Sequence, residues 1–67
     1  MITTAMERQI SKMGSKAMLK GRTQFSGNVF DHKTGMAYFV IGRIEENVLT
    51  VDFRRHKDLD VYFTVKF

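Results

Sequence analysis

Five basic side chains lie within the first 22 residues, and four of them recur at every fourth position: Arg8, Lys12, Lys16, Lys20 and, outside that repeat, Arg22. Only one acid, Glu7, accompanies them, whereas residues 23–67 hold six acids and six bases. The net charge of +4 is therefore concentrated in one segment. On a helix this spacing forms a slowly turning stripe, and an ordered row of cations is suited to binding an anion such as a phosphate.

Residue types that support catalysis are sparse in this chain. There is no cysteine, and His32 and His56 fall in or beside turns at opposite ends of different expected strands. They complete neither a metal-ligand spacing nor a nucleophile and base pair. Asp58 and Asp60 lack the rest of a calcium loop, and no glycine-rich phosphate-binding segment precedes a helix. We therefore expect a binding protein, not an enzyme, with no cofactor and no metal site.

The basic stripe requires a helix near the N-terminus. Thr4 and Glu7 fit a capping box, in which the hydroxyl and the carboxylate satisfy free backbone N–H groups. Apolar residues then fall on one face at helical spacing: Met6, Ile10, Met13 and Ala17. We expect this helix to end by Gly21 and to lay its apolar face on a core.

From Gln24 onward, short runs of β-branched and aromatic residues predict four strands. Three turn-like clusters separate them, at residues 33–35, 45–47 and 56–58. If each cluster is a three-residue loop, the closing pairs are His32 with Met36, Ile44 with Val48, and Arg55 with Leu59. The predicted fold class is α+β, with one N-terminal helix packed on a four-stranded antiparallel meander sheet of order 1-2-3-4. We expect a single small domain over residues 1–67.

This register sorts the strand residues onto two faces by parity. The odd-numbered face is nearly all apolar and is expected beneath the helix: Phe25, Val29, Phe39, Ile41, Leu49, Val51, Phe53, Val61, Phe63, Val65 and Phe67. The even-numbered face is mixed and carries a local apolar patch. Together with a methionine that lies off the apolar stripe of the helix, this patch forms the predicted partner interface: Met18, Phe30, Tyr38, Val40 and Tyr62.

Two functions are compatible with these features. The first is a small basic nucleic-acid-binding protein, for DNA or RNA, whose cationic helix contacts phosphates. Its predicted contacts are Arg8, Lys12, Lys16, Lys20 and Arg22, with Arg43, Arg54 and Lys66 assisting from the sheet. The alternative is a non-enzymatic protein-interaction module, such as a compact inhibitor or adaptor, that docks on an acidic surface of a larger protein.

The last strand predicts self-association. Residues 61–67 alternate apolar and polar types and would lie at the edge of the meander with unpaired backbone groups. A homodimer could form through this edge or through the even-numbered face. No run approaches the roughly 20 apolar residues of a membrane span, and no secretory signal is recognisable. We therefore expect a cytoplasmic protein without a membrane partner.

Overall fold

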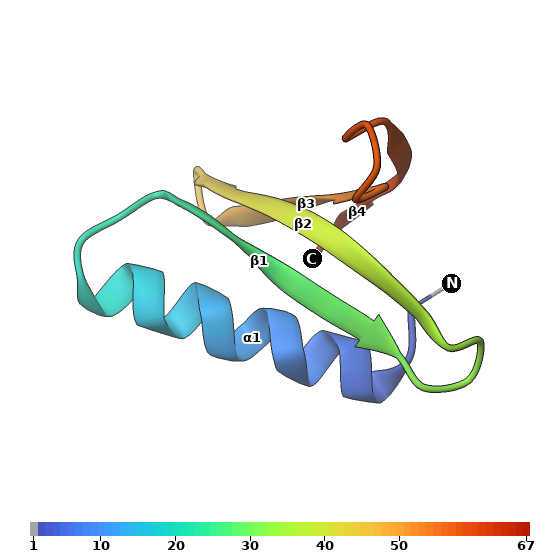
Figure 1. Cartoon of the computed structure of the whole chain (residues 1–67). Helices are drawn as coiled ribbons and strands as arrows, with labels where there is room; N and C mark the ends of the chain where they lie inside the picture. The colour runs from blue at the N-terminus through green and yellow to red at the C-terminus, as the bar shows by residue number, and fades with distance from the viewer. Residues whose placement is uncertain (1) are drawn as a thin grey trace.

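One helix and four strands make up the computed structural model, which describes residues 2–67 (Figure 1). The elements are α1 (Thr4–Leu19), β1 (Gln24–Asp31), β2 (Met36–Glu45), β3 (Val48–Arg54) and β4 (Val61–Lys66). The strands form one antiparallel sheet in the order β1-β2-β3-β4, and α1 packs along β1 (Figure 1). The predicted α+β architecture and strand order are confirmed.

The start of α1 differs by one residue from the prediction. Thr3, not Thr4, is the N-cap, and its hydroxyl accepts a hydrogen bond from the Met6 backbone N–H at 3.2 Å. The predicted capping box is therefore wrong, because Met6 now occupies the helical position that a capping-box glutamate needs. Glu7 still lies in the first turn, where its negative charge suits the helix dipole.

The end of α1 lies where the sequence predicts it. Gly21 adopts a φ of 69°, and its backbone N–H donates to the Met18 carbonyl oxygen at 3.0 Å. The Arg22 backbone N–H donates to the Ala17 carbonyl oxygen at 2.9 Å. These two bonds form a Schellman motif, which satisfies the last carbonyl groups and turns the chain back toward β1.

All three hairpins differ from the predicted register. The first closes with Asp31 opposite Met36 around a four-residue loop, and the second closes with Glu45 opposite Val48 around a two-residue turn. Each loop is thus one residue longer or shorter than the three-residue loop that composition predicted. In the third hairpin, Phe53 lies opposite Phe63 and a register shift follows at the next residue of β3, so the predicted pairing of residues 55 and 59 is also wrong.

After the first two shifts, β2 is the strand that buries the opposite face from the predicted one. Because a one-residue slip exchanges the faces of a strand, two successive slips restore the predicted faces of β3 and of the regular part of β4. In β2, Tyr38 and Val40 are buried, whereas Phe39 and Ile41 lie on the sheet face that α1 does not cover. The predicted partner interface is corrected accordingly, since Tyr38 and Val40 are core residues and not part of an exposed patch.

The core lies between α1 and the inner face of the sheet. Its buried apolar members are Met6, Ile10, Val29, Tyr38, Val40, Val51 and Phe53. Phe53 is fully buried, stacks on Phe63 with ring centroids 4.6 Å apart, and meets the Tyr38 ring edge at 5.6 Å. Val61 and Phe67, which were expected in this core, remain about half exposed at 47% and 48%. Val61 begins β4 and Phe67 follows its last residue. β4 is an edge strand, and the homodimer through that edge stays a prediction.

Gly42 explains how β2 can face the helix in this orientation. It lies on the inner face under the Phe25 ring, and an added Cβ would collide with that ring. We expect Gly42→Ala to lower the free energy of unfolding by about 1–3 kcal/mol through overpacking. Urea denaturation of Gly42→Ala, Phe25→Leu and the double variant would measure this, and the smaller leucine should offset part of the loss. A denaturation midpoint equal to that of the wild type would contradict the packing.

Asp31, at the end of β1, makes stability depend on acid pH. Its carboxylate is buried, with 6% of the residue exposed, and Oδ1 accepts from the Lys33 backbone N–H at 2.9 Å. Desolvation raises its pKa, but hydrogen bonds from Lys33 and Thr34 outweigh this and hold the pKa below the usual 3.8. The stabilisation is therefore present above the unfolded-state pKa and is lost as pH falls through the lower folded-state pKa.

This acid dependence can be measured with one substitution. In Asp31→Asn the new side chain would keep an acceptor oxygen but would not titrate, so the melting temperature of this variant should fall less than that of the wild type between about pH 5 and pH 2. Thermal melts followed by circular dichroism give both curves. Parallel curves for the two proteins would rule out this role for the carboxylate.

Candidate nucleic-acid interface

The basic stripe turns around α1 as it runs toward the C-terminal end of the helix. At 3.6 residues per turn, each step of four residues advances the side chain by about 40° beyond one full turn. Arg8 and Lys12 lie on a surface formed by helix residues alone. A second surface lies on the flank of α1 that runs alongside β1. Lys16 borders both this surface and the first one, and Lys20 lies on the second surface alone.

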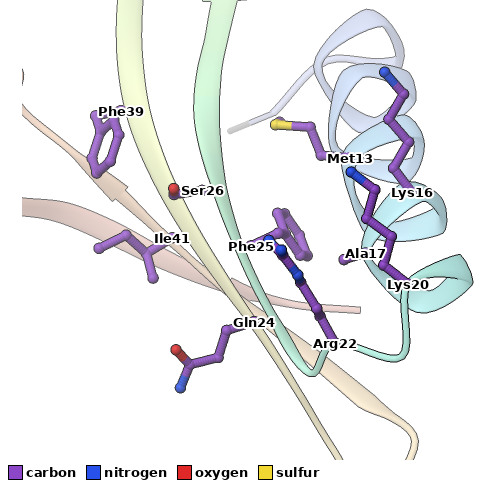
Figure 2. Close-up of a pocket in the computed structure, with 10 residues that line it drawn as sticks. All are labelled: Met13, Lys16, Ala17, Lys20, Arg22, Gln24, Phe25, Ser26, Phe39 and Ile41. Atoms are coloured by element: carbon purple, nitrogen blue, oxygen red, sulfur yellow. The ribbon is translucent and has the colours of Figure 1, made fainter.

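A hollow lies where the C-terminal half of α1 meets the start of β1 (Figure 2). From the helix side it is lined by Met13, Lys16, Ala17, Lys20 and Arg22, and from the strands by Gln24, Phe25, Ser26, Phe39 and Ile41. Because β1 is an edge strand, the hollow passes around its edge, from the helix flank to the open face of the sheet. Three cations and no acid are among the lining residues.

Three acids of β3 and the last loop are paired with arginines that do not line the hollow. Asp52 lies 3.0 Å from the Arg54 guanidinium and also accepts a hydrogen bond from the Thr64 hydroxyl at 3.0 Å. Asp58 and Asp60 both pair with Arg55. The side-chain hydrogen bond from Arg55 also lowers the pKa of the Asp58 carboxyl. These ion pairs engage three of the six acids of residues 23–67, and no acid is among the residues that line the hollow.

The open face of the sheet presents two apolar side chains, Phe39 and Ile41, beside the hollow. They are half-buried and lie opposite Asn28 and Ser26 of the edge strand, respectively. The Phe39 ring also contacts the His56 ring edge, with centroids 6.2 Å apart. A partly exposed aromatic ring on an uncovered sheet face is a surface on which a nucleobase can stack.

Lys16, Lys20 and Arg22 are the predicted contacts that the structure brings together. Arg43 and Lys66 are exposed on the open face, in the row of paired residues that also holds Gln24 and Thr50. Arg54 lies on this face as well, but it donates to the Asp52 carboxylate and to the Leu59 carbonyl oxygen, each at 3.0 Å. Asp60, in the same loop region, pairs instead with Arg55.

The remaining members of the predicted partner interface do not form one surface. Met18 is 65% exposed near the end of α1, Phe30 is 41% exposed near the end of β1, and Tyr62 is 46% exposed in β4 beside Tyr38. Figure 1 shows that α1 and β1 run in opposite directions, so their C-terminal ends lie far apart. A single docking patch is therefore not assembled from these side chains.

Sequence reasoning missed Phe39 and Ile41 because it placed them in the core. A signal was available in Asp31, since aspartate favours the first position of a turn and its side chain can bond the backbone two residues on. The structure shows this bond to Lys33. Starting the first loop after Asp31 would have turned β2 over and exposed Phe39.

No protein-family model, curated protein or solved structure matches this chain. Within residues 2–67, no group of metal-ligating side chains could hold an ion. No helix in the described part of the chain has the length and apolar character to cross a membrane. Function is therefore inferred from the geometry and charge of the hollow and the adjoining sheet face.

Proposed function

We propose that this protein binds nucleic acid through the hollow between α1 and β1 and the adjoining open face of the sheet. The observation that carries the proposal is the convergence of Lys16, Lys20 and Arg22, without an acid, on a hollow that opens toward Phe39. The cations neutralise phosphates, and the aromatic ring provides a stacking surface. Figure 2 shows the three cationic side chains along the C-terminal half of α1 and the turn that leads into β1.

The number of cations sets the expected salt dependence. Each neutralised phosphate releases counterions, which changes log K against log salt concentration by about −0.7 to −0.9. Three contacts therefore predict a slope of about −2 to −3. Fluorescence anisotropy with a labelled oligonucleotide, measured over a series of salt concentrations, would give this slope. Absence of binding at about 50 mM salt, or binding that salt does not weaken, would contradict the proposal.

Phe39 should contribute to affinity without contributing much to folding. We expect Phe39→Ala to weaken oligonucleotide binding by about 5- to 150-fold, because loss of one stacked base costs about 1–3 kcal/mol. Phe30→Ala is the matched control, since Phe30 is a phenylalanine of the neighbouring strand that is 41% exposed and does not line the hollow. Equal losses for the two variants would remove Phe39 from the proposed site.

Docking on an acidic protein surface has less support. The same cations could serve it, but two of the five predicted interface residues, Tyr38 and Val40, are buried. The other three are dispersed over different elements. Protein interfaces concentrate their binding energy in a few clustered side chains, usually near the centre of the contact. Here the cluster next to the cations is Phe39 and Ile41, which suits a stacked base.

A further inference from the structure

The β1 edge presents backbone groups beside the cationic hollow. In an antiparallel ladder, alternate residues bond the neighbouring strand and the others point away from it. The Thr23 carbonyl oxygen accepts from the Ile44 backbone N–H at 2.8 Å, which places the odd-numbered residues toward β2. The even-numbered residues therefore direct their backbone N–H and C=O outward: Gln24, Ser26, Asn28 and Phe30.

The outward N–H and C=O of one of these residues, Phe30, already bond a planar side-chain amide. Gln9 Nε2 donates to the Phe30 carbonyl oxygen, and Gln9 Oε1 accepts from the Phe30 backbone N–H, each at 3.0 Å. The carboxamide thus supplies one donor and one adjacent acceptor in a single plane. Among residues 2–67, no side chain bonds the corresponding backbone groups of Asn28 or Ser26. The outward backbone groups of Ser26 and Asn28 are therefore open along the edge, next to the pair that Gln9 already binds.

An unpaired nucleobase carries the same arrangement as the Gln9 carboxamide. The Watson–Crick edges of adenine, cytosine, guanine and uracil each place a donor next to an acceptor, and single-stranded ligands are recognised through these edges. Successive outward pairs on a strand are separated by about 6.8 Å. An unstacked single strand can match that spacing, whereas stacked bases lie only about 3.4 Å apart.

We infer that the ligand is single-stranded nucleic acid and that the β1 edge binds its bases through backbone groups of Ser26 and Asn28. This inference rests on the proposed function and names its ligand class. Lys16, Lys20 and Arg22 hold the phosphates on the helix side of the edge, while Phe39 stacks a neighbouring base on the other side. A duplex cannot offer its Watson–Crick edges to β1, because these groups are already paired. Binding shows little sequence preference, since all four bases offer a donor beside an acceptor.

Three ligands of equal length test this inference with the wild-type protein. They are a single-stranded oligonucleotide, the duplex of the same sequence, and an oligonucleotide whose central residues are abasic. We expect the single strand to bind at least about tenfold more tightly than either of the others, because both lack available base edges. An oligoglutamate of similar length, added as a competitor, should not displace the single strand at equal concentration.

Ser26 allows a matched pair of protein variants. Ser26→Pro removes the outward N–H without removing a bond to β2, as edge strands tolerate, and Ser26→Ala keeps that N–H. We expect Ser26→Pro to bind the single strand about tenfold more weakly than Ser26→Ala does, and we expect the two variants to bind the abasic strand with equal affinity. Circular dichroism would check folding. If Ser26→Pro does not fold, the single strand and the abasic strand are compared in Phe39→Ala, where stacking on Phe39 is absent and a remaining preference for the single strand would come from the edge contacts.

The outcomes separate this inference from the proposed function. Equal affinity for the single strand and the abasic strand would overturn base binding at the β1 edge but leave phosphate binding by the hollow. Equal affinity for the duplex would do the same. Failure of all three ligands to bind at low salt would overturn both. Displacement of the single strand by oligoglutamate would instead assign the edge to an acidic extended peptide.

Discussion

Phe53→Ala should lower the free energy of unfolding by about 3–5 kcal/mol, because it removes a large side chain from a closed core. Phe53 has an exposed fraction of 0%, and its ring contacts those of Phe63 and Tyr38. A domain of 67 residues has little stability in reserve, since it buries a smaller share of its surface than a larger domain. We therefore expect most of the Phe53→Ala molecules to be unfolded at 25 °C, as measured by circular dichroism and urea titration.

Phe39→Ala is the control for this prediction and also tests the orientation of β2. It deletes the same atoms one strand away, but from the face that α1 leaves uncovered. We expect a loss of about 1 kcal/mol or less, as for substitutions outside the core. A larger loss for Phe39→Ala than for Phe53→Ala would show that the opposite face of β2 is buried.

Reversing the two lysines of the hollow should abolish most nucleic-acid binding. Lys16→Glu with Lys20→Glu changes the net charge from +4 to 0, and so does Arg8→Glu with Lys12→Glu. We expect the first pair to lose about 100-fold or more in affinity at about 0.1 M salt, because two phosphate contacts become repulsive. The second pair should lose less than about tenfold, since Arg8 and Lys12 do not line the hollow and salt partly screens exposed charges that make no direct contact.

The equal net charge of the two double variants makes the comparison informative. Equal losses would show that overall charge attracts the ligand and that the hollow is not the site. New acids near the end of α1 also oppose the helix dipole by about 0.3–1 kcal/mol each. Helix content is therefore measured for both variants, and Lys16→Gln with Lys20→Gln provides a milder substitution for the same site.

Local sequence patterns predicted most of the architecture. The helix followed from apolar residues at spacings of three and four, and its end followed from Gly21, which takes the positive φ of the Schellman motif. In β3, strict alternation assigned Val51 and Phe53 to the core, because the residues between them are polar. Such segments offer one apolar face, and burying that face decides their orientation.

The turns were less predictable because their composition does not determine their length. Glu46 and Asn47 both adopt positive φ, at 49° and 66°, and close the second hairpin in two residues. Glutamate is an uncommon residue for that conformation, so the sequence favoured a longer loop. One residue more or fewer in a loop exchanges the faces of the following strand, and the first two loops were each misjudged by one residue.

By itself the sequence determined the helix, its turning row of cations, the number and order of the strands, and the inward faces of β1 and β3. Only the tertiary structure decided which face of β2 is buried, because that strand is apolar on both sides. Gly42 faces inward where the Phe25 ring needs space, and Tyr38 packs against Phe53. As a result, Phe39 and not Tyr38 lies on the open face beside the lysines.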